Sequence, residues 1–130
     1  MSFPSAEWAS AFQKALNENA AYADAARAWV GDILLRVRPA NASEPAPGVL
    51  LDLANGSCRA ATYYPDAREV ASEFVYEGRP EDWQRLMRHE LDPVKAILDG
   101  TFRVHGNLAK LLRFTRAAKE LVETASNVPP

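Results

Sequence analysis

Residues 82–114 read DWQRLMRHELDPVKAILDGTFRVHGNLAKLLRF, and this stretch decides the fold because helical and strand patterns alternate within it. Apolar residues at helical spacing predict a first helix, and they are Trp83, Leu86, Met87 and Leu91. Pro80 suits the first position of that helix. Asp92 and Pro93 then predict an N-cap and the start of a short helix that ends at Gly100.

The second part of the stretch predicts a strand and a last helix. In residues 102–105, Phe102 and Val104 point inward while Arg103 and His105 point outward. A helix is then expected from about residue 108 to residue 125. Its apolar side comprises Leu108, Leu111, Leu112, Ala118, Leu121 and Val122.

Upstream of this stretch, four runs alternate with a period of two and predict strands in residues 31–38, 48–54, 57–64 and 72–78. Asn55-Gly56 is a strong signal for a two-residue hairpin. The residues expected on the inner face are Ile33, Leu35, Val37, Val49, Leu51, Leu53, Phe74 and Tyr76. Because each run has one apolar face, the sheet is expected to be covered mainly on one side.

The N-terminal residues 5–29 have a helical pattern with Trp8, Phe12 and Leu16 on one face, and Asn17 and Asn19 are expected to interrupt it. The Pro-rich residues 39–48 connect two strands. The sequence therefore predicts a single α+β domain over residues 1–130. It has a five-stranded, mostly antiparallel sheet with helices packed on one face.

Composition narrows the class of protein. The 130 residues include 15 Lys and Arg against 17 Asp and Glu, for a net charge of -2, which argues against a nucleic-acid binder. Cys58 is the single cysteine, so no intramolecular disulfide can form. No apolar run in the sequence suits a signal peptide or a spanning helix. A cytoplasmic location is expected.

Signatures of catalysis are missing from the sequence. There is no G-x-S-x-G elbow, no Walker loop and no G-x-G-x-x-G. His89-Glu90 begins like a zinc-protease helix, but Pro93 stands where the second histidine belongs. With Cys58 and His105 as the other soft ligands, no metal site or cofactor is expected. Cys58 is expected to be a buried, unreactive thiol.

A cationic stripe is the clearest charge feature. Between residues 101 and 119 there is no acidic residue, and the cations are Arg103, Lys110, Arg113, Arg116 and Lys119. Two interpretations remain open. The stripe is either a solvated helix face, or a surface that contacts phosphate or an anionic headgroup.

The order of elements resembles the sterol carrier protein 2 (non-specific lipid-transfer) domain family over roughly residues 29–125. The resemblance is carried by the helix opening at Asp82, the short helix ending at Gly100, the strand 102–105, and Gly106-Asn107 before the last helix. It also includes the strand beginning at Gly31 and the hairpin at Asn55-Gly56.

This resemblance implies an apolar tunnel between the sheet and the helices. The ligands it implies are fatty acids, acyl-CoA, phospholipids or sterols, held without covalent chemistry or cofactor. The residues expected to contact lipid are Leu35, Val37, Leu51, Leu53, Phe74, Tyr76, Trp83, Leu86, Met87, Ile97, Phe102, Val104, Leu108, Leu111 and Leu112. Lys110 and Arg113 are expected to contact the headgroup, with transient contact to an anionic membrane.

Two other functions stay open. Domains of this fold also serve as regulatory or dimerisation modules, so a free-standing copy could bind a protein partner; an exposed apolar patch would favour that function. A weaker alternative is an enzyme acting on a hydrophobic substrate, with His105 or Tyr64 as acid or base.

Overall fold

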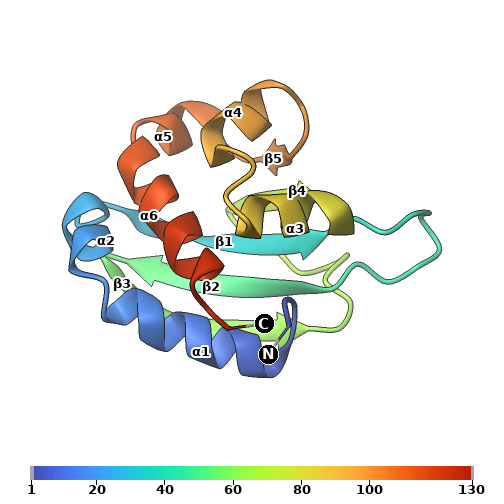
Figure 1. Ribbon diagram of the computed structural model, residues 1–130, viewed down its shortest axis with the longest axis horizontal. Coiled ribbons are helices and arrows are strands. Elements are labelled where there is room, and N and C mark those ends of the chain that lie inside the picture. The colour runs from blue at the N-terminus through green and yellow to red at the C-terminus, as the bar shows by residue number, and fades with distance from the viewer. Residues whose placement is uncertain (1, 130) are drawn as a thin grey trace.

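The computed structural model describes residues 2–129, which form one five-stranded sheet and six helices (Figure 1). The strands are β1 (Val30–Val37), β2 (Gly48–Ala54), β3 (Ser57–Tyr64), β4 (Phe74–Gly78) and β5 (Arg103–His105). The helices are α1 (Ala6–Asn17), α2 (Ala20–Ala25), α3 (Pro80–Met87), α4 (Pro93–Leu98), α5 (Leu108–Leu112) and α6 (Thr115–Ser126). None of the helices in this part of the chain combines the length and hydropathy needed to span a membrane.

The sheet is mixed, and its strand order is β3-β2-β1-β4-β5. β1 pairs with β4 in parallel, while the other three neighbouring pairs are antiparallel. The predicted α+β class and mostly antiparallel sheet are therefore confirmed. The parallel pair sets the carboxyl ends of β1 and β4 side by side, and the backbone N–H of Arg38 donates to the carbonyl of Gly78 at 2.8 Å.

Local sequence signals account for the main turns. Asn55 and Gly56 have φ angles of 53° and 85°, and positive φ at both central residues is what the type I′ turn of a two-residue hairpin requires. The Asp92 carboxylate accepts hydrogen bonds from the N–H groups of Val94 and Lys95 at 2.9 and 3.0 Å, so α4 begins where predicted. Gly100, with a φ of 83°, follows its end.

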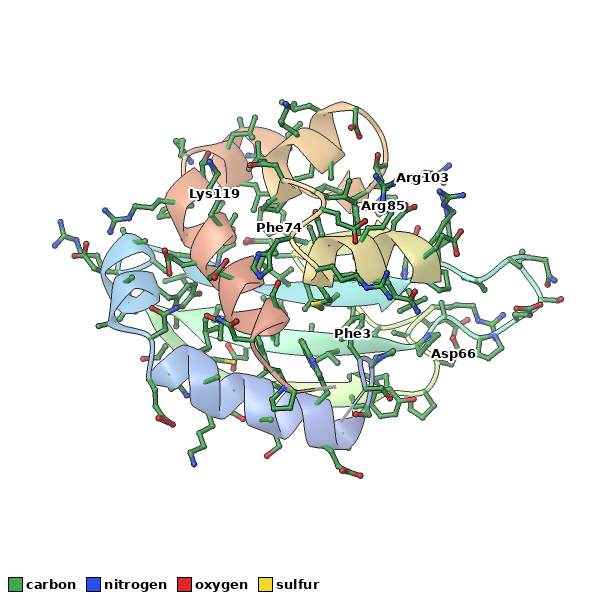
Figure 2. The ribbon with its side chains drawn as sticks, in the orientation of Figure 1. Phe3, Asp66, Phe74, Arg85, Arg103 and Lys119 are labelled. Carbon is green, nitrogen blue, oxygen red and sulfur yellow. The ribbon has the colours of Figure 1, made fainter. Side chains whose placement is uncertain are left out.

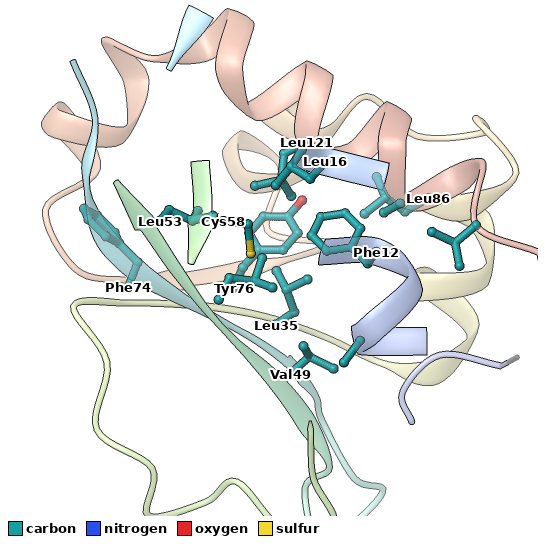
Figure 3. Close-up of a cluster of buried hydrophobic side chains, with 14 of the residues drawn as sticks. Phe12, Leu16, Leu35, Val49, Leu53, Cys58, Phe74, Tyr76, Leu86 and Leu121 are labelled. Carbon is teal, nitrogen blue, oxygen red and sulfur yellow. The ribbon is translucent and has the colours of Figure 1, made fainter. Parts of the chain in front are cut away.

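The helices pack on one face of the sheet and enclose the core (Figures 1 and 3). Leu35, Val49, Leu51, Leu53 and Phe74 all point into this core and are nearly inaccessible to solvent. The opposite face is covered only locally, by loop residues. Leu34 is buried there near Gly48 and Ala67.

The N-terminal helical pattern is interrupted as predicted. Asn17 ends α1, and the Asn19 side chain caps α2 by accepting from the N–H of Tyr22 at 3.0 Å. Cys58 is also buried as expected, on β3, where burial raises the pKa of its thiol to about 11. At neutral pH this cysteine is therefore a protonated thiol and a weak nucleophile.

The prediction of one continuous last helix from residue 108 to residue 125 is wrong. The chain forms α5 and α6, which are separated at Arg113 and Phe114. Phe114 leaves helical geometry, with φ -115° and ψ 38°, and its ring packs edge-on against Trp29 with 5.1 Å between centroids. The break therefore lets the partly buried Phe114 ring pack against the core, and it also divides the cationic stripe between two helices.

Candidate functional site

An apolar cavity lies between the sheet and the four C-terminal helices. Strands β1, β4 and β5 contribute Ile33, Leu35, Phe74, Val75, Tyr76 and Val104. Helices α3 and α4 contribute Trp83, Leu86, Met87, Pro93, Val94 and Ile97, and helices α5 and α6 contribute Leu111, Leu112, Ala118, Leu121, Val122 and Ala125. We call this space the apolar cavity, and its volume is about 60 Å³.

Most of the residues expected to contact lipid line this cavity. They are Leu35, Phe74, Tyr76, Trp83, Leu86, Met87, Ile97, Val104, Leu111 and Leu112. The others lie elsewhere. Val37, Leu51, Leu53 and Phe102 are buried in the surrounding core, and Leu108 is 38% exposed on α5.

Part of the wall was not among the residues expected to contact lipid, although Ala118, Leu121 and Val122 were expected on the apolar side of the last helix. The inner face of α6 supplies Ala118, Leu121, Val122 and Ala125, which recur at helical spacing. That spacing was a usable signal, since it marks one face of the helix. Pro93 and Val94 of α4 also line the cavity, and so does Val75, although it alternates along β4 with the inward-facing Phe74 and Tyr76.

The two lining residues that carry polar atoms have those atoms bonded to backbone. Tyr76 Oη donates to the carbonyl of Pro93 at 3.1 Å, and Trp83 Nε1 donates to the carbonyl of Arg36 at 3.1 Å. Burial raises the pKa of Tyr76, and the nearby Asp92 and Asp99 raise it further, so the phenol stays protonated. The cavity therefore offers dispersion and hydrophobic contact, with its polar groups already engaged.

The part of the wall formed by α4 and α5 is thin. These helices have six and five residues; Ala96 is the buried residue of α4, and α5 has none. Leu98 on α4 is 67% exposed, and Leu112 on α5 is 37% exposed although it lines the cavity. Short helices with little buried surface are the elements that open at lowest free energy.

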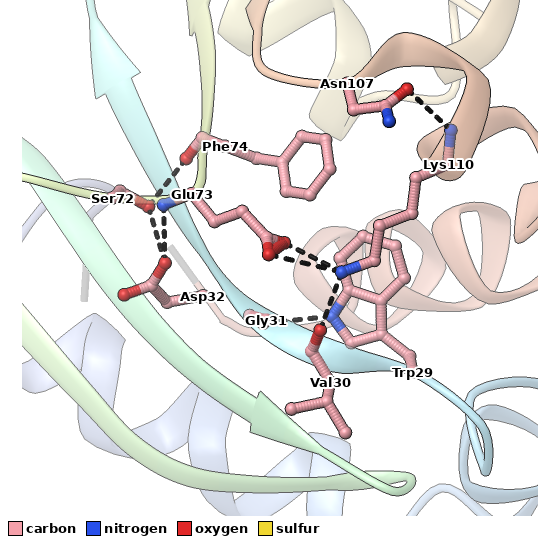
Figure 4. Close-up of polar contacts among 9 residues, drawn as sticks. All are labelled: Trp29, Val30, Gly31, Asp32, Ser72, Glu73, Phe74, Asn107 and Lys110. Carbon is pink, nitrogen blue, oxygen red and sulfur yellow. Dashed lines mark hydrogen bonds and ion pairs between the residues drawn. The ribbon is translucent and has the colours of Figure 1, made fainter.

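The two cations expected at a headgroup lie in different surroundings. Lys110 Nζ lies 2.8 Å from Glu73 Oε2, 2.8 Å from the Val30 carbonyl oxygen, and 4.7 Å from the centre of the Trp29 ring (Figure 4). Arg113 is exposed at the end of α5 and forms no ion pair within residues 2–129. Lys110 is thus engaged in holding α5 against the sheet, whereas Arg113 faces solvent.

The residues named for a catalytic alternative are not brought together. Tyr64 ends β3 and His105 ends β5, and these strands form opposite edges of the sheet. Neither residue lines the apolar cavity. Within residues 2–129, no three His, Cys, Asp or Glu side chains cluster in a way that could hold a metal ion.

Comparison with known proteins agrees with this geometry. A family model described as the SCP-2 sterol transfer family matches residues 11–119. A crystal structure of sterol carrier protein 2 superposes with a TM-score of 0.92 at 34% identity, covering 98% of this chain and 100% of that chain. A solution structure from Thermus thermophilus, described as possibly a sterol carrier protein, gives a TM-score of 0.87 at 34% identity, with 98% and 90% covered.

A more distant structure shares the fold. Palmitated SCP2L2 from Aedes aegypti gives a TM-score of 0.53 at 13% identity, covering 87% of this chain and 92% of that chain. None of the curated proteins matches the chain in sequence. The family match spans most of the chain, and the 34% identical structures cover nearly all of it, so this chain belongs to the SCP-2 sterol transfer family.

Proposed function

We propose that this protein binds the apolar chain of a fatty acid, acyl-CoA, phospholipid or sterol in the apolar cavity, and releases it chemically unchanged. The observation that carries the proposal is the wall itself, which presents hydrocarbon and aromatic surface while Tyr76 Oη and Trp83 Nε1 are bonded to backbone carbonyls. Membership of the sterol transfer family supports the same function.

The free energies of moving an acyl chain between environments suit a lipid carrier. Burial stabilises each methylene by about 0.8 kcal/mol relative to water, so a long acyl chain gains on the order of 12 kcal/mol. Relative to a bilayer the gain is near zero, because the chain is already out of water there. A protein with an apolar cavity can therefore take a lipid from one apolar environment and give it to another without catalytic residues.

The cavity has to widen when an acyl chain enters. Its volume of about 60 Å³ is well below the roughly 300 Å³ at which ligand pockets begin. The thin wall formed by α4 and α5 is the part that can move, because these helices bury little surface. We therefore expect ligand to displace α4 and α5 outward while the sheet and α6 keep their places.

A cavity-filling variant tests the proposal. Ala118→Leu places a larger side chain in the cavity, and we expect palmitate to bind at least tenfold more weakly in isothermal titration while the protein stays folded. Ala109→Leu makes the same change on the exposed side of α5 and is the matched control. Wild-type binding should show a negative ΔCp, as burial of apolar surface requires.

The outcomes separate the functions. Loss of binding in Ala118→Leu with normal binding in Ala109→Leu supports a lipid carrier. Equal palmitate affinity in all three proteins would show that palmitate does not bind in the apolar cavity. In that case the exposed Leu98 and Leu112 favour the regulatory module that binds a protein partner.

A further inference from the structure

A second hollow lies where the carboxyl ends of β1 and β4 meet, and five arginines line it. They are Arg36, Arg38, Arg68, Arg79 and Arg103, and the loop of residues 39–47 forms the opposite wall. We call this open hollow of about 980 Å³ the arginine basin. It holds a third of the chain's 15 basic residues, although the net charge of the protein is -2.

Sheet topology gathers these arginines from distant parts of the sequence. Arg36 lies opposite Glu77 in the parallel pairing of β1 with β4, and Glu77 lies opposite Arg103 in the antiparallel pairing of β4 with β5. Arg38 and Arg79 follow the ends of β1 and β4, which are side by side. Figure 2 shows Arg103 at the end of the molecule where the loop between β1 and β2 projects.

Glu44, Glu77 and Glu81 also line the basin, and acidic groups pair with only some of its cations. Arg36 Nε lies 2.6 Å from Glu77 Oε2, a nearly buried pair, and Arg79 Nε lies 2.7 Å from Asp82 Oδ2. Arg38 and Arg103 form no ion pair within residues 2–129. Two guanidinium groups in the basin are therefore available to an anion, and those bonded to carboxylates hold the surrounding wall in place.

The loop wall is anchored by hydrogen bonds. Arg68 Nη1 donates to the carbonyl of Ala42 at 3.2 Å, and the Asp66 carboxylate accepts from the N–H of Ala46 at 3.2 Å. The Arg68 guanidinium, hydrogen-bonded to Asp66, lowers the pKa of that carboxyl to about 2. Asp66 therefore stays ionised at neutral pH, and the loop is attached to the fold at Ala42 and at Ala46.

A third hollow adjoins both the basin and the apolar cavity. Between them lies a groove of about 550 Å³ beside the N-terminal residues Phe3 and Pro4, which we call the terminal groove. It shares Trp83, Met87 and Ala125 with the apolar cavity. It shares Val37 and Pro80 with the arginine basin. The terminal groove therefore adjoins both the apolar cavity and the arginine basin.

We propose that the arginine basin binds the phosphate or diphosphate group of an anionic ligand. Arginine forks match phosphate oxygens in bidentate geometry, and a hollow of this size admits more than a single carboxylate. This inference rests on the proposed function where the phosphate belongs to an amphiphile such as acyl-CoA, whose chain occupies the apolar cavity. A soluble diphosphate has the same chemistry and is the other source.

The test compares two double variants that each remove two positive charges. Arg38→Gln/Arg103→Gln empties the basin of its unpaired cations. The control, Lys14→Gln/Lys95→Gln, removes two exposed cations that have no ion pair within residues 2–129, on α1 and on α4. Each protein is titrated with inorganic pyrophosphate, free CoA, palmitoyl-CoA and palmitate at one fixed salt concentration.

We expect the basin variant to bind pyrophosphate and CoA at least tenfold more weakly, and the control to stay within twofold of wild type. If the basin variant binds palmitoyl-CoA more weakly by the same factor, the phosphate group in the basin belongs to an amphiphile. If its affinity for palmitoyl-CoA is unchanged, the phosphate group belongs to a soluble anion. The proposal is contradicted if wild type binds neither pyrophosphate nor CoA, or if the control loses as much affinity for them as the basin variant does. Arg103→Gln alone, a change of one exposed side chain, distinguishes the same outcomes if the double variant fails to fold.

Palmitate separates this inference from the proposed function. Its carboxylate and chain need no phosphate site, so the basin variant should bind palmitate as wild type does. Loss of palmitate binding in Ala118→Leu concerns the apolar cavity alone. If wild type binds pyrophosphate but not palmitate, the proposed lipid-carrier function is contradicted and the proposed phosphate site is not.

Discussion

Lys110 Nζ lies 2.8 Å from Glu73 Oε2, and this ion pair joins α5 to the residue that precedes β4 (Figure 4). The same ammonium donates to the Val30 carbonyl at 2.8 Å and lies over the Trp29 ring. Glu73 is itself positioned, because its N–H donates to Asp32 Oδ1 at 2.6 Å. One lysine thus fastens the thin part of the cavity wall to the sheet.

Replacing Lys110 with Met should loosen α5. Methionine keeps the apolar stem but loses the ion pair and the cation–π contact with Trp29. We expect faster amide hydrogen exchange in residues 108–114, with the rest of the chain unchanged. The free energy of unfolding should fall by about 1 kcal/mol or less, since the Lys110 and Glu73 side chains are 25% and 44% exposed. Because opening then costs less, palmitate should bind somewhat more tightly.

Glu73→Gln supplies the partner for a double-mutant cycle. A coupling of about 0.5 kcal/mol between the two substitutions, shrinking in high salt, is the signature of the ion pair. A cycle with no coupling, or hydrogen exchange that accelerates evenly along the chain, would contradict a role for this pair in holding α5.

The sheet could be predicted from sequence because each strand buries one face. Alternation with a period of two placed Leu35, Leu51 and Leu53 inward, and Asn55-Gly56 identified the hairpin. The break in the last helix could not be predicted in this way. It depends on Phe114 packing against Trp29, a contact between residues far apart in sequence that helical spacing does not encode.

The candidate site was predictable only in part, for a related reason. Alternation shows which face a residue occupies, but it does not show whether a helix packs directly on it. Leu53 and Leu35 have the same pattern, yet Leu35 lines the cavity and Leu53 belongs to the surrounding core. Strand order places β1 beside β4 and β4 beside β5, and it thereby brings Arg38 and Arg103 to the same hollow and provides the partners of Lys110. The order of strands in the sheet cannot be read from the alternation within each strand.

Asp92 should make the stability of α4 depend on pH. Hydrogen bonds from the N–H groups of Lys95 and Val94 and the nearby Lys119 and Lys95 lower the pKa of its carboxyl. A lowered pKa means that the ionised carboxylate stabilises the fold above its ordinary pKa of about 3.9, and that this stabilisation is lost as pH falls through the lower folded value.

Urea unfolding of wild type and Asp92→Ala at neutral and acid pH measures this effect. At neutral pH the variant should lose about 1 kcal/mol, as expected for an N-cap. The difference between the proteins should shrink below the pKa of the folded state. A difference that stays constant from neutral to acid pH would show that ionisation of Asp92 does not contribute.

Phe3 should control the rate at which ligand enters through the terminal groove. Its ring centre lies 4.7 Å from Trp8 and 4.6 Å from Trp83, and Trp83 lines both the groove and the apolar cavity. Phe3→Ala removes this ring and widens the path beside Trp83. The half-buried ring contributes about 1–2 kcal/mol to stability, so the variant is expected to fold.

Stopped-flow measurements with fluorophore-labelled palmitate give the association and dissociation rates separately. We expect both rates to rise severalfold in Phe3→Ala, because Phe3 obstructs the path without lining the apolar cavity. The dissociation constant should then change by less than about threefold, since both rates shift together. Phe3→Leu keeps an apolar side chain at the same place and should give intermediate rates. If both variants exchange ligand at the wild-type rate, the path beside Phe3 is not the entrance, and the chain enters instead where Leu112 is exposed at the end of α5.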